Sequence, residues 1–191
     1  MGRRRRVAPQ QGQPDLRIDI LSHILGTNEK DLKDSSLKLH IPVQQDDQVI
    51  GHLPVTVMHP FHILQSRIAN VLKIDNPDST VVTVRQRQAK AAPIILREYL
   101  REALAEGNVE DVRGTLRQLA KWLRSDNSGQ QVRRFVDYDP KLILNEHMAS
   151  EQLDPRWLKN NLTKMIADVE QHRNSQAQRS AAIAFKHQMG R

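Results

Sequence analysis

The polar residues that could do chemistry gather where a strand pattern meets a helix pattern. The stretch from Leu53 to Ile74 contains five of them: His59, His62, Ser66, Arg67 and Asn70. A sixth candidate, Asp19, is the acid in the middle of the alternating apolar run RIDIL. Imidazole, hydroxyl, guanidinium and amide groups can hydrogen-bond a polar ligand, and a carboxylate can hold a divalent cation.

A zinc site is not predicted. His59 precedes a proline whereas His62 lies in the first helical turn, and neither Glu-x-x-His nor His-Glu-x-x-His occurs. The absence of cysteine excludes disulfides, thiolate metal sites and cysteine nucleophiles. We expect His59 to end a strand and to hydrogen-bond to the backbone.

Three common kinds of active site lack their motifs. No Gly-x-Ser-x-Gly elbow is present for a serine hydrolase. The glycines are spread singly, so neither a P-loop nor a dinucleotide-binding Gly-x-Gly-x-x-Gly turn can be formed.

Asp19 and Arg67 each allow more than one interpretation. Asp19 either faces solvent or presents a carboxylate to a divalent metal and a nucleotide phosphate, a ligand set that suits Mg²⁺. Arg67 is a surface cation, a guanidinium aimed at phosphate or carboxylate, or half of an ion pair to a sheet carboxylate.

The elements that must position these residues follow from apolar periodicity. Alternation predicts strands over 16–20, 37–41 and 49–58, with a polar turn at 44–48. Pro60 is suited to the first position of a helix, and its apolar stripe is Phe61, Leu64, Ile68, Val71 and Leu72. We therefore predict an α+β fold with a small, mostly antiparallel sheet in the N-terminal third, followed by a helical bundle.

The rest of the chain is predicted to be helical. A long helix precedes Gly107-Asn108, with a kink or a junction of two helices at Pro93. A further helix spans 112–123, and a loop is expected over 125–129. Asp139-Pro140 and Asp154-Pro155 open the last two helices.

Four segments result: a disordered basic N-terminus (1–14), a partial sheet subdomain (15–59), a helical subdomain (60–170) and a flexible or helical basic tail (171–191). The net charge is +7, and the two ends hold all of the excess. The arginine run near the N-terminus either binds nucleic acid or is a solvated terminus. It consists of Arg3, Arg4, Arg5 and Arg6. Without an apolar run long enough to cross a bilayer, we expect no membrane contact and a cytoplasmic location.

The order of four segments resembles the DNA polymerase β-like nucleotidyltransferase superfamily. These segments are RIDILSHILG, a strand pair, VTVMHPFHILQSRIANVLKI and RQRQAKAAPIILREYLREAL. The similarity covers about residues 16–105 and is closest to bacterial proteins akin to abortive-infection toxins. The resemblance implies that Asp19 is the third metal-binding carboxylate and a catalytic residue. It also implies that Pro60, Leu64, Arg67 and Asn70 occupy the motif of the helix that packs onto the sheet.

The superfamily also needs a Gly-Ser turn and a paired Asp-x-Asp upstream, which nothing before Leu16 supplies. The chain thus resembles such a protein without its catalytic first third, and a lone carboxylate cannot assemble a two-metal mechanism. The implied cofactor is Mg²⁺ if the chain is active, with a nucleoside triphosphate as ligand and Arg67, His59, Ser66 and Asn70 as substrate-binding residues. The alternative is a non-enzymatic basic α+β module that binds nucleic acid through its termini or binds protein. The oligomeric state is not predicted.

Overall fold

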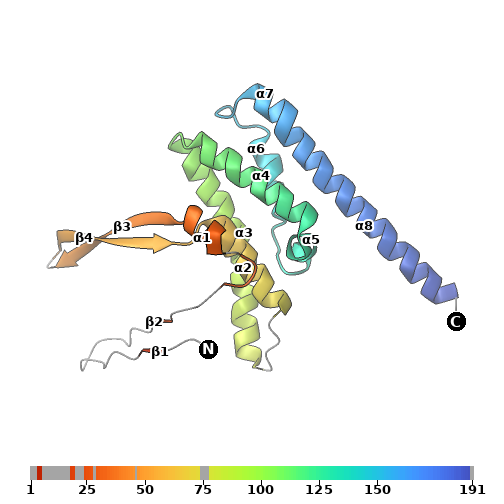
Figure 1. The fold of residues 1–191 in the computed structure, drawn as a ribbon, viewed down its shortest axis with the longest axis horizontal. Helices are drawn as coiled ribbons and strands as arrows, with labels where there is room; N and C mark the ends of the chain where they lie inside the picture. Colours follow the sequence, from red (N-terminus) through yellow and green to blue (C-terminus); the bar gives the residue numbers. More distant parts are fainter. Residues whose placement is uncertain are drawn as a thin grey trace.

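The computed structural model describes residues 4–5, 18–19, 24–27, 29–45, 47–73 and 78–189. It is an α+β structure in which a strand pair precedes a helical body, so the predicted fold class is confirmed (Figure 1). The strands are β1 (Arg4–Arg5), β2 (Ile18–Asp19), β3 (Leu37–Gln45) and β4 (Gln48–Val57). The longer helices are α2 (Pro60–Lys73), α3 (Ser79–Ala105), α4 (Val109–Ser125) and α8 (Thr163–Met189).

The shorter helical elements join and close this body. They are α1 (Glu29–Asp34), α5 (Asn127–Gln131), the 3₁₀ turn η1 (Val132–Arg134), α6 (Lys141–His147), α7 (Pro155–Trp157) and the π-helical turn η2 (Leu158–Leu162).

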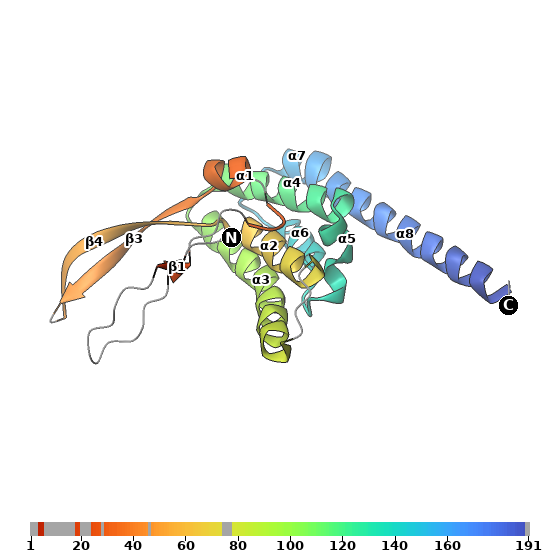
Figure 2. The same cartoon turned by 60° about the horizontal axis from the view of Figure 1, so that its bottom comes forward.

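Strands β3 and β4 form an antiparallel hairpin that projects from the helical body (Figures 1 and 2). Their register places Leu39 opposite Val55 and Ile41 opposite Leu53, with an irregularity after Val43. Because side chains alternate between the faces of a strand, these apolar residues share one face. Leu39, Ile41 and Leu53 are 45–55% exposed, so this hairpin face is uncovered.

The first two strands form a separate ladder. Arg4 pairs with Asp19 and Arg5 with Ile18, and this two-stranded sheet does not join the β3–β4 hairpin. We predicted one small sheet, whereas the described strands make two independent pairs. The remaining residues of the predicted strand at 16–20, and of the segment 1–14, lie outside the described residues.

Helix α2 begins at Pro60 as predicted, because the fixed φ of proline suits the first helical turn. Phe61, Leu64 and Ile68 are buried in the core against α3, and Val71 and Leu72 pack at its edge. Gly26 (φ +83°) lies so close to α2 that an added Cβ would come within 2.7 Å of the Ala69 Cβ. The loop before α1 is thus held against α2 by a glycine that no other residue could replace without strain.

We predicted a kink or a junction of two helices at Pro93. Helix α3 is one helix that continues through Pro93, so the junction is wrong, whereas the kink stays a prediction. Pro93 and its neighbours Ala89, Ala92 and Leu96 are buried, and this packing keeps the helix continuous although one hydrogen bond of the ladder is missing. As predicted, the helix stops at Gly107, which adopts φ +80°. The N–H of Asn108 then bonds the Ala103 carbonyl at 2.8 Å, a Schellman-type ending.

The predicted loop at 125–129 is instead a turn into helix α5. The Asp126 carboxylate accepts the Ser128 N–H at 2.8 Å and thereby caps this short helix. Asp154 caps α7 in the same way through the Trp157 N–H at 2.8 Å, as the Asp-Pro sequence predicted.

Helix α8 packs against α4 and α6 and then continues past the body to Met189 (Figures 1 and 2). Ile183 and Phe185, near its end, are 59% and 60% exposed. A bidentate ion pair from Arg173 to Asp139, at 2.7 and 2.9 Å, ties the middle of α8 to the turn before α6. None of the helices in the described part of the chain is long and apolar enough to cross a membrane.

Candidate functional site

The hinge between β4 and α2 is organised by His59, whose side chain is buried. Its carbonyl accepts the N–H groups of His62 and Ile63, at 2.9 and 3.1 Å, and its ring Nδ1 accepts the N–H of Phe61 at 3.1 Å. His59 therefore caps the N-terminus of α2 with both backbone and ring. This confirms the prediction of a strand-end histidine bonded to the backbone.

The other ring nitrogen of His59 faces α4. Nε2 lies 3.5 Å from the Thr115 Oγ1 and 3.8 Å from an oxygen of Asp111. Because Nδ1 is an acceptor, the ring carries its proton on Nε2, which points to these two groups. Burial lowers the pKa of His59, and the Asp111 carboxylate opposes that shift only in part.

Asp111 also accepts a hydrogen bond from Tyr99, at 2.6 Å, and the His59 and Tyr99 rings meet edge to face with centroids 4.9 Å apart. Burial, together with this hydrogen bond, raises the pKa of Tyr99. The hinge is thus fixed to α3 and α4 through a connected polar network, and His59 is a positioning residue in it.

His62 makes the second polar cluster of the hinge, one turn further along α2. Its Nε2 lies 2.7 Å from Ser35 Oγ and its Nδ1 lies 2.8 Å from Gln65 Oε1. The distances match those of a nucleophile, a base and an orienting group. The Ser35 hydroxyl also lies 2.5 Å from the Asp31 carbonyl, and its single proton can be donated to only one of these two acceptors. We interpret this cluster as a link between α1 and α2.

A pocket of about 630 Å³ opens beside this link. It is lined by the aromatic residues Phe61 and Trp122 and by hydrogen-bonding side chains in or next to α1, α2 and α4: Asp31, Ser35, His62, Gln65, Gln118, Lys121, Ser125 and Asp126. Such a mixed lining suits a small polar ligand that also has an apolar part.

The remaining candidates on α2 divide by exposure. Ser66 is buried in the helical body. Arg67 and Asn70 are half-buried and lie one turn apart on the helix, and the structure shows no hydrogen bond or ion pair of the Arg67 guanidinium with the other described residues. Of the predicted substrate-binding residues, Arg67 and Asn70 therefore have side-chain surface available, whereas His59 and Ser66 are enclosed.

Asp19 lies opposite Arg4 in the β1–β2 ladder. The structure thus brings the predicted metal-binding residue together with one arginine of the predicted nucleic-acid-binding run. A single carboxylate fits the binding of Mg²⁺ together with substrate phosphates, but it does not fit a two-metal centre. Elsewhere in the described residues, no group of three or more His, Asp or Glu side chains is arranged to hold a metal.

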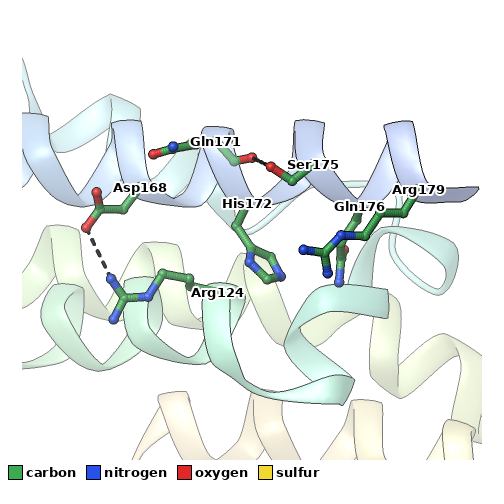
Figure 3. A pocket seen from close by; sticks show the side chains of 7 residues that line it. All are labelled: Arg124, Asp168, Gln171, His172, Ser175, Gln176 and Arg179. Carbon is green, nitrogen blue, oxygen red and sulfur yellow. Dashed lines mark hydrogen bonds and ion pairs between the residues drawn. The ribbon is translucent and has the colours of Figure 1, made fainter.

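A second concave surface lies between α4 and α8 and was not predicted. It consists of two adjoining pockets, about 330 and 200 Å³, which share Arg124 and Asp168 (Figure 3). We call it the α4–α8 groove and define it by Arg117, Lys121, Arg124, Asp168, His172 and Arg179. Figure 3 shows His172 and Arg179 extending from α8 toward α4 and α5.

A sequence signal for this groove exists on α4. The four cations of α4 recur at intervals of four, four and three residues, which places them on one helical face beside the buried apolar residues: Arg113, Arg117, Lys121 and Arg124. The α8 residues carry no such signal, because helix α8 has weak apolar periodicity beyond Gln171. Their position over α4 depends on tertiary packing.

No protein-family model matches the chain, and no curated protein or solved structure is significantly similar to it. The resemblance to nucleotidyltransferases therefore stays a prediction from the sequence.

Proposed function

We propose that this chain is a nucleotidyltransferase-like cytoplasmic protein with an incomplete metal site. It is related to enzymes that transfer a nucleoside monophosphate from a nucleoside triphosphate to an acceptor. The single observation that carries the proposal is the hinge, in which a strand ends at a buried histidine cap and passes through Pro60 directly into the central helix of the body.

The hinge supports the proposal because it fixes the segment that follows β4 to the helical body. Ligand sites often lie where two units of a fold meet, and Arg67 and Asn70, about two turns or more beyond Pro60 on α2, are half-buried polar residues with surface available. In the proposed complex, the planar guanidinium of Arg67 contacts a phosphate in bidentate fashion. Asp19 provides one carboxylate to the Mg²⁺ that accompanies the nucleotide.

The uncovered hairpin face supports the second half of the proposal, that the site is incomplete. Two-stranded hairpins are marginally stable by themselves, and this one exposes Leu39, Ile41 and Leu53 along one face. Both of its edges are free of described strands. A further polypeptide segment that carries the Gly-Ser turn and the Asp-x-Asp pair would cover this face and complete the sheet.

Without that segment, the expected activity is ligand binding and not transfer. In-line transfer needs two metal ions bound by several carboxylates, whereas Asp19 is the one carboxylate that we predict to bind metal. The protein by itself should therefore bind a magnesium–nucleotide complex without turning it over.

Calorimetric titration with each of the four common nucleoside triphosphates, with and without Mg²⁺, tests this proposal. We expect binding that requires Mg²⁺ and is lost in Asp19→Asn. The matched control is Asp47→Asn, which removes a carboxylate from the hairpin turn at a residue with φ 61°, a conformation that asparagine tolerates.

Two outcomes contradict the proposal. One is the absence of nucleotide binding in the unmodified protein. The other is equal loss of affinity in Asp19→Asn and Asp47→Asn, because a general charge effect would then explain the result.

Arg67→Gln should weaken nucleotide binding in parallel with Asp19→Asn.

The alternative function is a non-enzymatic α+β module that binds protein or nucleic acid. The same uncovered hairpin face favours protein binding, since exposed apolar surface of this kind marks interaction sites. If this function is the correct one, magnesium–nucleotide binding is absent and Asp19→Asn behaves as the unmodified protein.

A further inference from the structure

We propose that the α4–α8 groove binds the phosphodiester backbone of a nucleic acid, independently of base sequence. The inference does not depend on the nucleotidyltransferase proposal, because it uses none of the residues of the hinge. It shares His172 and Arg179 with the predicted basic tail, but it places the site in a groove formed with α4 and not at the two ends of the chain.

The charge of the groove is the first argument. Its walls carry four permanent cations, Arg117, Lys121, Arg124 and Arg179, against the single carboxylate of Asp168. That carboxylate is engaged by Arg124 at 3.1 Å. The groove therefore keeps a net positive charge, which attracts polyanions.

Unused hydrogen-bond donors are the second argument. Lys121 and Arg179 make no hydrogen bond or ion pair with the residues that the structure describes, although many other cations of the body are paired. The Nε2 atom of His172 is buried and lacks a partner in that same part of the chain. The Lys121 ammonium and the Arg179 guanidinium can therefore donate hydrogen bonds to a ligand in the groove.

The length of the groove favours an extended ligand over a single small anion. The two pockets adjoin at Arg124 and Asp168, and the α4 cations recur along the helix at about one per turn, or roughly 5 Å. A row of evenly spaced cations matches the repeated charges of a phosphate backbone. The guanidinium carbons (Cζ) of Arg113 and Arg117 lie 5.2 and 5.7 Å from the centroid of the Trp157 ring. These cation–π contacts hold that end of the row in place.

Fluorescence anisotropy with a labelled mixed-sequence RNA, across about 50 to 200 mM salt, tests the inference. In the double variant Lys121→Gln/Arg179→Gln we expect weaker binding. The slope of log K against log salt concentration should be shallower by about 2, roughly one for each lost phosphate contact. Neither substitution leaves a partner unpaired, so the fold should be unchanged by circular dichroism.

The charge-matched control is Arg87→Gln/Arg101→Gln, which removes two positive charges from exposed positions on α3, outside the groove, together with the ion pair of Arg101 to Glu98. It should keep the salt dependence of the unmodified protein. Asp168→Asn should bind RNA several-fold more tightly, because it removes the one acid in the groove and frees Arg124. A damaged fold would not bind RNA more tightly, so this variant distinguishes an effect of groove charge from a loss of structure.

Three results would overturn the inference. The first is equal weakening in the groove variant and the α3 control, which would mean that only net charge matters. The second is binding restricted to one base sequence. The third is displacement of the RNA by low concentrations of inorganic phosphate, which would indicate a site for a single anion.

Discussion

At the scale of residues, His59 uses its backbone and both ring nitrogens to fix the hinge. The carbonyl and Nδ1 cap α2, and Nε2 faces Thr115 and Asp111 on α4. A protonated ring could not accept the Phe61 N–H, so the cap requires the neutral form. Burial favours that same neutral form by lowering the pKa of His59.

This arrangement predicts acid sensitivity. The His59 pKa in the folded state lies below the 6.5 of the unfolded chain, so the unfolded state binds protons first as the pH falls. The stabilisation is complete well above pH 6.5 and is lost progressively in the range below it. Urea unfolding across this range should show a falling free energy of unfolding, and the buried His147, whose pKa is also lowered by burial, should contribute to the fall.

The variant His59→Asn separates the two histidines. Asparagine keeps a side-chain oxygen that can accept the Phe61 N–H but does not titrate. Its free energy of unfolding should therefore fall less steeply with decreasing pH than that of the unmodified protein. Identical pH dependence in the two proteins would show that His59 does not contribute through its protonation.

Sequence reasoning located this hinge because local patterns determine it. Alternating strand residues, a histidine before proline and the stripe beginning at Phe61 are all adjacent in the chain. The partners of the hinge could not be found in this way. Ser35 lies 27 residues from His62, and Thr115 lies 56 residues from His59, so only tertiary packing brings them together.

At the scale of elements, the β3–β4 hairpin differs from the helices that follow it in how far its apolar side chains are buried. Leu64 and Ile68 on α2 are fully buried, whereas Ile41 and Leu53 on the hairpin are about half exposed. Burial of apolar area is the main source of stability, so the helical body should not depend on the hairpin face.

Paired substitutions test this contrast. Ile41→Lys/Leu53→Lys should change the free energy of unfolding of the helical body by less than about 0.5 kcal/mol, as exposed substitutions usually do. Leu64→Ala, which empties a fully buried position, should lower it by about 2–5 kcal/mol. Both can be measured by urea unfolding followed by helical circular dichroism.

A loss in the hairpin variant as large as that of Leu64→Ala would contradict the account. It would mean that the hairpin face is packed in solution, either on the body or on a second copy of the chain. Sedimentation of the unmodified protein distinguishes these two cases.

Other elements show where sequence patterns are insufficient. Pro93 predicted an interruption of α3, but its burial among core alanines and leucines outweighs the missing hydrogen bond. Likewise, the polar stretch 125–129 predicted a loop, yet Asp126 caps a short helix that packs Ser128 and Gly129 against Trp122. In both cases tertiary packing decides against the local propensity.

At the scale of the whole molecule, a helical body stands between two extensions, the hairpin and the end of α8 (Figure 1). The α+β class followed from the change of apolar period at Pro60. The separation of β1–β2 from β3–β4 did not, because strand pairing depends on contacts that no local pattern encodes. The basic groove also exists only once α8 lies across α4.

Hydrogen exchange with and without a magnesium–nucleoside triphosphate mixture shows where the nucleotide binds and so tests nucleotide binding at the hinge. We expect slower exchange near Asp19 and along α2, with no change in α6 or α7. Absence of protection, or protection confined to the α4–α8 groove, would contradict nucleotide binding at the hinge.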